Sequence, residues 1–95
     1  MKSFELISAP KELYKKMLKD ISHAKRSICL EAYIYSNDKI GRLFREELTK
    51  KAKQGVKVRV LIDSFGSSGI RGSFFSELTQ CRGEIKFFRN IYDNF

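Results

Sequence analysis

The sequence is poor in the residues that build metal centres and disulfide frameworks, because it has only two cysteines and one histidine. Cys29 and Cys81 lie far apart, without a C-x-x-C pair or a histidine cluster beside either of them. This spacing argues against a zinc site and against a disulfide framework. We therefore expect two reduced, buried thiols, which fits an intracellular protein, and no metal or other cofactor.

Long hydrophobic runs are also missing. No apolar stretch approaches the roughly 18–20 residues that cross a bilayer, and lysines interrupt the first residues, where a signal peptide would be continuously apolar. With one proline and 42% hydrophobic residues, the composition is typical of a folded chain rather than a disordered tail. We expect one small domain that is cytoplasmic or peripheral at the inner face of the cell membrane.

Positive charge is what the sequence has in excess. Nineteen Lys and Arg residues stand against 11 Asp and Glu, which gives a net charge of +8 at pH 7. Such a chain favours polyanionic partners, namely anionic lipid surfaces, nucleic acid or phosphorylated substrates. Charge alone does not choose among these partners.

Apolar runs rich in β-branched residues begin near Ile28, Val56 and Ile85, and a helical pattern lies between each pair. This alternation predicts an α/β fold of βαβαβ order, with right-handed crossovers and parallel strands flanked by helices. The expected elements are a helix over 10–24, a strand over 27–35, a helix over 38–54, a strand over 56–63, a helix over 73–82 and a strand over 84–89.

The helix expected over 38–54 has clear end signals and a basic side. Asn37 or Asp38 is expected to cap its first turn, and Gly55 to end it in a left-handed conformation. Its cations either form a solvated face, with pairing between neighbouring turns, or contact an anionic surface. The candidates for binding such a surface are Lys39, Arg42, Arg45, Lys50 and Lys53.

His23 and Lys25 match the start of the phosphodiester-transfer motif H-x-K-x4-D, in which an imidazole attacks phosphorus and an aspartate orients the ring. The acid position of the motif is occupied by Leu30, however. Glu31 follows one residue late, and on a strand a slip of one residue turns the side chain to the other face. We therefore interpret His23 as a solvent-exposed histidine near a helix end.

The stretch LIDSFGSSG is the second candidate for chemistry. Asp63 stands at the carboxyl end of an expected parallel strand, which is the edge where open α/β sheets bind ligands. Gly66 and Ser67 follow it in a Gly/Ser-rich loop that offers backbone N–H groups and a hydroxyl to a phosphate. The predicted pocket rim is thus Asp63, Gly66 and Ser67, and the alternative is an ordinary strand-to-helix connection.

The stretch from Ile28 to Gly69 resembles the amino-terminal part of phospholipase D superfamily domains, and most closely the bacterial cardiolipin synthases. The matching pieces are Glu31 with AYIY, then Asp38 and Gly41 opening a helix, then KAKQGVKVRVLID and the loop after it. The resemblance extends through the first helix and to GEIKFF. It implies an incomplete half-domain whose mixed sheet is flanked by helices and duplicated in the full enzyme.

In that family each half contributes one H-x-K-x4-D motif to a single active site, one histidine forms a covalent phosphoryl intermediate, and no metal is needed. In the family's order the first motif follows the strand represented here by EIKFF. We therefore expect no catalytic residue in this chain, and the remainder of a phospholipase-D-like domain as its partner.

Three functions follow as hypotheses. The first is a fragment of a cardiolipin-synthase-like phosphatidyltransferase of phospholipid biosynthesis, membrane-associated and inactive alone. The second is a fragment of a superfamily phosphodiesterase or nuclease, since the basic charge suits either substrate. The third is a non-catalytic basic module that binds anionic lipid or nucleic acid, for which affinity for DNA would fall steeply with salt.

Overall fold

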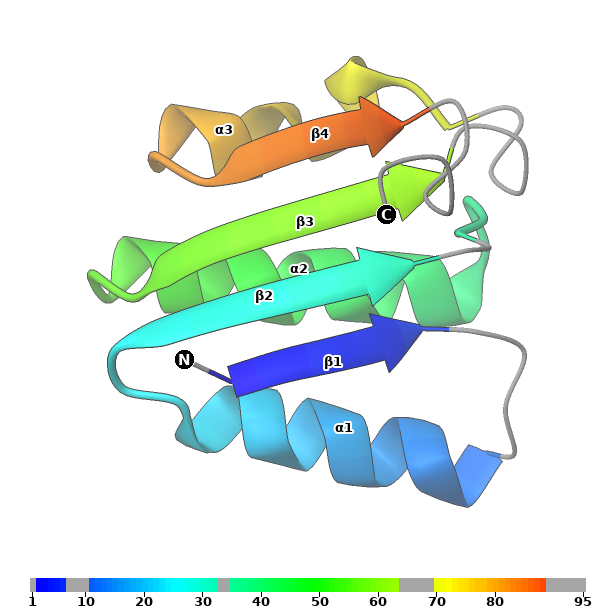
Figure 1. Cartoon of the computed structure of the whole chain (residues 1–95), viewed down its shortest axis with the longest axis vertical. Helices are drawn as coiled ribbons and strands as arrows, with labels where there is room; N and C mark the ends of the chain where they lie inside the picture. The colour runs from blue at the N-terminus through cyan, green and yellow to red at the C-terminus, as the bar shows by residue number, and fades with distance from the viewer. Residues whose placement is uncertain (1, 7–10, 33–34, 64–69, 89–95) are drawn as a thin grey trace.

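The computed structural model describes residues 2–6, 11–32, 35–63 and 70–88 of the chain, with side chains from residue 11 onward. Strands and helices alternate along it (Figure 1). The elements are β1 (Lys2–Leu6), α1 (Lys11–His23), β2 (Ser27–Ala32), α2 (Lys39–Lys53), β3 (Lys57–Asp63), the 3-10 helix η1 (Gly72–Phe75), α3 (Ser76–Gln80) and β4 (Glu84–Phe88).

The described strands form one four-stranded sheet in the order β1-β2-β3-β4. Every neighbouring pair is parallel, with Leu30 of β2 beside Val60 of β3, and Ile62 of β3 beside Phe87 of β4. The predicted α/β fold with parallel strands and flanking helices is therefore confirmed. The mixed sheet that the resemblance implied is not seen among these four strands.

The helices lie together on one face of the sheet, α1 packed on α2 and α2 on α3 (Figure 1). This follows from the strand order, because right-handed crossovers between successive neighbours place every helix on the same side. The core fills the space between these layers. Its largest buried side chains are Tyr35, Phe44, Phe75, Ile21, Ile28, Leu30, Leu48, Ile62, Leu78, Val58 and Val60.

Three elements differ from the sequence-based expectation. Strand β1 was not predicted, because five residues at a sheet edge give little pattern before they pair with β2. The single helix expected over 73–82 is two pieces, the 3-10 helix η1 and the short α3. The strand expected to reach residue 35 ends at Ala32, and Tyr35 lies outside it.

The ends of α2 are those predicted. Asp38 caps its first turn, because its carboxylate accepts a hydrogen bond of 2.8 Å from the Gly41 N–H. Gly55 follows the last turn with φ 89°, in the left-handed region that glycine enters without strain. The N–H of Gly55 donates to Ala52 and that of Val56 to Lys51, which is a Schellman motif.

Helix α3 ends in the same motif, but with an arginine in the left-handed position. Arg82 has φ 72° and donates its N–H to the Thr79 carbonyl, while Gly83 donates to Leu78. Gly83 therefore stands one residue after the left-handed position.

Candidate functional site

The carboxyl edge of the sheet holds one of the three predicted rim residues. Asp63 is the last residue of β3 and is buried, with 8% of its surface exposed. Successive side chains of a strand point to opposite faces of the sheet, and the side chain of the preceding residue, Ile62, belongs to the core beneath the helices. The side chain of Asp63 therefore lies on the face away from the helices. Gly66 and Ser67 lie outside the described residues, so the pocket rim stays a prediction.

An aromatic cluster beside this edge joins the start of α2 to η1. Tyr35 is fully buried and makes edge-to-face contacts with Phe74 and Phe75, at ring-centroid distances of 5.9 and 5.4 Å. Its hydroxyl donates a 2.6 Å hydrogen bond to the Gly41 carbonyl. Burial raises the pKa of the Tyr35 hydroxyl, so the phenol is neutral and acts as a hydrogen-bond donor.

Arg45 extends this connection from the second turn of α2. Its guanidinium carbon lies 4.2 Å from the centroid of the Phe74 ring, and its Nη1 donates to the Phe74 carbonyl at 3.3 Å. Sequence reasoning assigned Arg45 to an anionic surface and Tyr35 to a strand. The only sequence signal for the contacts of these two residues with η1 is the pair of adjacent phenylalanines at 74 and 75, and a hydrophobic pattern assigns that pair simply to core packing.

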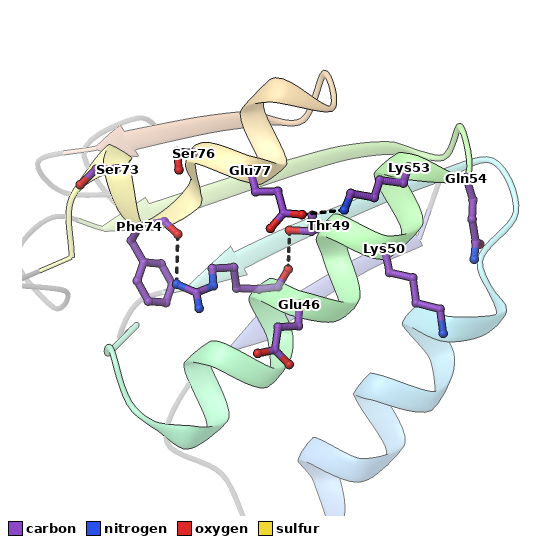
Figure 2. A pocket seen from close by; sticks show the side chains of 10 residues that line it. Glu46, Thr49, Lys50, Lys53, Gln54, Ser73, Phe74, Ser76 and Glu77 are labelled. Atoms are coloured by element: carbon purple, nitrogen blue, oxygen red, sulfur yellow. Dashed lines mark hydrogen bonds and ion pairs between the residues drawn. The ribbon is translucent and has the colours of Figure 1, made fainter.

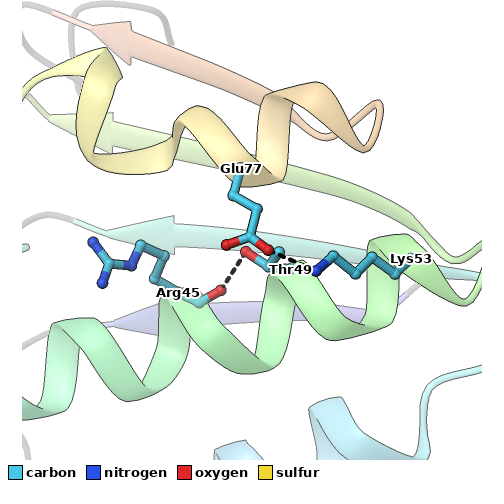
Figure 3. Close-up of polar contacts among 4 residues, drawn as sticks. All are labelled: Arg45, Thr49, Lys53 and Glu77. Atoms are coloured by element: carbon cyan, nitrogen blue, oxygen red, sulfur yellow. Dashed lines mark hydrogen bonds and ion pairs between the residues drawn. The ribbon is translucent and has the colours of Figure 1, made fainter.

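A polar groove of about 700 Å³ runs between the second half of α2 and the η1–α3 segment (Figure 2). Lys53 and Glu77 join its two walls by an ion pair of 2.6 Å, and the Thr49 hydroxyl donates to the Arg45 carbonyl below them (Figure 3). The hydrogen bond with Glu77 raises the pKa of Lys53, and its counterpart lowers the pKa of Glu77. The groove thus pairs charges across helices.

The structure places the predicted anionic-surface residues in three environments. Lys39, Lys50 and Lys53 are exposed along α2. Arg42 is exposed and hydrogen-bonds the carbonyl and the side chain of Asn37, while Arg45 is half-buried against Phe74. The five residues therefore do not form one continuous surface, and their binding role stays a prediction.

His23 lies at the carboxyl end of α1, exposed, and β2 begins four residues after it. It therefore stands near the edge of the sheet where the strands begin, whereas Asp63 stands where β3 ends. The two side chains cannot form one catalytic pair. The exposed position agrees with the interpretation of His23 as a solvated residue.

Cys29 is buried and Cys81 half-buried, and neither forms a disulfide bond. Within the part of the chain that the structure describes, no three His, Cys, Asp or Glu side chains come together as a group that would hold a metal ion. Among these same residues, no helix has both the length and the apolar character needed to cross a membrane.

Comparison with known proteins identifies relatives of one kind. The major cardiolipin synthase of Bacillus subtilis is 42% identical over 86 residues, which cover 90% of this chain and 18% of that protein. A cardiolipin synthase of Clostridium perfringens is 40% identical over 76 residues, covering 80% of the chain and 16% of the relative. Cardiolipin synthase 1 of Bacillus cereus is 35% identical over 88 residues, covering 93% and 17%.

The chain thus spans less than a fifth of the length of these relatives. No protein-family model matches it. No solved structure matches it either. The identities confirm the resemblance seen in the sequence: the chain is homologous to one segment of proteins named cardiolipin synthase.

Proposed function

We propose that this chain is part of a phosphatidyltransferase that makes cardiolipin, and that it supplies scaffold rather than catalytic groups. The observation that carries the proposal is identity of 35–42% to proteins named cardiolipin synthase over most of the chain. The parallel sheet with helices on one face agrees with a role as half of a larger α/β unit.

The scaffold role follows from where the chain's own groups lie. Phosphoryl transfer by the family's route needs an imidazole, a lysine and an acid in one pocket. The single histidine of the chain, His23, is exposed near the edge where the strands begin, far along the strand direction from Asp63. We therefore expect the nucleophile to come from other polypeptide and the 95-residue chain to be inactive by itself.

At the opposite edge, Asp63 and the loop that follows it form the proposed rim of the substrate pocket. Ligands of open α/β sheets bind at the carboxyl ends of strands, and Asp63 is the last residue of a central strand. The cluster of Tyr35, Phe74 and Phe75 holds the start of α2 and η1 beside this edge. Its proposed role is to keep the rim in place.

A chimaera tests the proposal. The segment of the Bacillus subtilis enzyme that matches this chain is replaced by the chain's residues, and cardiolipin formation from phosphatidylglycerol is measured. We expect the chimaera to retain activity, and Asp63→Asn in the chimaera to lower kcat more than Lys57→Ala at the other end of the same strand. An inactive but folded chimaera would contradict the proposed function.

The chain alone is assayed in parallel. Transfer between phosphatidylglycerol molecules by the purified 95-residue chain would overturn the proposed inactivity. A chimaera that cleaves nucleic acid and makes no cardiolipin would instead favour a superfamily phosphodiesterase.

A further inference from the structure

We propose that the outer face of the helix layer docks on an anionic lipid bilayer, with Leu43 entering the interface between headgroups and acyl chains. The proposal rests on the proposed function, because it takes a phospholipid surface as the partner. This outer helical face is defined by exposed residues of α1 and α2, namely Lys15, Lys16, Lys19, Lys39, Leu43, Lys50 and Lys53.

The two helices present these residues to the same side. Met17 and Ile21 of α1 are buried toward the sheet, as are Phe44 and Leu48 of α2. Both helices cover the same face of the sheet and pack side by side, with Tyr14 of α1 against Phe44 at 6.0 Å between ring centroids. Side chains half a turn from the buried stripes therefore point away from the sheet on both helices.

This face concentrates positive charge. Its six lysines are accompanied by the exposed Glu12 and Glu46, by Glu47 at the groove between the helices and by Glu77, which pairs with Lys53, so lysines exceed acids there by two. Glu12 lies 3.8 Å from Lys15 in a pair whose side chains are both largely exposed. Exposed pairs of this kind are weak, so lipid phosphates can compete for the lysine.

The opposite face of the sheet has no such excess. Among the residues whose side chains the structure describes, from residue 11 onward, the charged side chains of this face are three acids, Glu31, Asp63 and Glu84, and three bases, Lys57, Arg59 and Lys86. Arg59 Nε lies 3.1 Å from Glu84 Oε2, within ion-pair distance although outside hydrogen-bond geometry. The charge asymmetry between the two faces gives the molecule one side that an anionic surface attracts.

Leucine among the lysines distinguishes a bilayer from other polyanions. Leu43 is 40% exposed at a shallow groove of about 460 Å³ between α1 and α2, which Leu18 also lines. Lys19 and Lys50 line the same groove, together with Glu46 and Glu47. An apolar side chain flanked by lysines is typical of surfaces that lie in the membrane interface, because the leucine enters the apolar boundary while the ammonium groups stay at phosphate level.

Nucleic acid would be drawn by the same charge but would gain little from Leu43. Single-stranded nucleic acid is bound by aromatic platforms among the cations, and duplexes by contacts to phosphates and base edges. The outer helical face has no aromatic residue among its exposed members. The combination of lysines with a leucine therefore favours a lipid surface.

The test measures binding of the full 95-residue chain to vesicles of phosphatidylglycerol mixed with phosphatidylcholine, and to vesicles of phosphatidylcholine alone. The variant Lys19→Glu/Lys50→Glu is compared with Lys57→Glu/Lys86→Glu, which changes the net charge equally but on the opposite face. We expect the first pair to weaken binding to the anionic vesicles about tenfold or more, and the second pair to weaken it much less. Circular dichroism checks that both variants are folded.

Two leucines of similar exposure supply the apolar control. Leu43→Ala is expected to weaken vesicle binding, whereas Leu13→Ala is expected to leave it nearly unchanged. Leu13, although exposed, lies one turn before the buried Met17 and so projects from the sheet side of α1 rather than from the outer helical face. Equal losses from both lysine pairs, or tighter binding to duplex DNA than to anionic vesicles, would overturn the proposal. Vesicle binding needs no turnover, so an inactive chimaera together with a 95-residue chain that still requires Lys19 and Lys50 for binding would defeat only the proposed function.

Discussion

Replacing Gly41 by alanine is predicted to destabilise the protein, although alanine is the better helix former. Gly41 lies in the first turn of α2, where its N–H donates to the Asp38 carboxylate and its carbonyl accepts from the Tyr35 hydroxyl. A Cβ at this position would overlap the Ser36 carbonyl oxygen and lie 3.1 Å from a Tyr35 ring carbon. The atom in the way is backbone, so the chain before the helix would have to move.

Two effects oppose each other at this position. Helix propensity favours alanine over glycine by up to about 1 kcal/mol. Overpacking of a tight site typically costs about 1–3 kcal/mol, and displacing Ser36 also disturbs the cap and the Tyr35 hydrogen bond, which contribute about 1 kcal/mol each. The steric terms are larger, and we expect Gly41→Ala to lower the free energy of unfolding by about 2–3 kcal/mol.

Urea denaturation followed by circular dichroism measures this change, with Gly72→Ala as the matched control. A Cβ at Gly72 meets no atom within 4 Å, so that substitution is expected to be neutral or to stabilise by up to about 1 kcal/mol. If Gly41→Ala proved as stable as the unchanged protein, the close approach of the Ser36 carbonyl would not be the reason for glycine at this position.

Further predictions concern stability and pH. Arg82→Gly should raise the free energy of unfolding by about 0.5–1 kcal/mol in urea titrations, because it relieves a left-handed arginine; a loss would contradict the strain. Phe75→Ala should lower it by about 3–5 kcal/mol, since Phe75 is fully buried; a loss under about 1 kcal/mol would contradict that burial. Lys53 lowers the pKa of Glu77, so this stabilisation is present above the unfolded pKa of about 4.3 and is lost as pH falls through the lowered value. Glu77→Gln should therefore lower the thermal midpoint slightly at neutral pH and not in strong acid, and a difference that persisted in acid would exclude the Lys53 pair as its cause.

Much of the fold could be predicted because its signals are local. Leu13, Met17 and Ile21 recur at helical spacing, and Val58, Val60 and Ile62 alternate as a strand requires. The candidate site was less predictable. Its proposed members Asp63 and Tyr35 belong to segments far apart in the sequence, and no periodicity reports that α2 and η1 meet around the Tyr35 ring.

The sequence by itself determined the alternation of helices and strands from residue 11 onward, the cap at Asp38 and the left-handed turn at Gly55, because these depend on side chains a few residues apart. Tertiary structure decided that the short β1 is a strand, since it gains its hydrogen bonds only from β2. It also turned Arg45 to Phe74, and it gathered the lysines of two helices on one face. Those outcomes depend on which elements become neighbours, and the handedness of the crossovers determines this only once the whole sheet has formed.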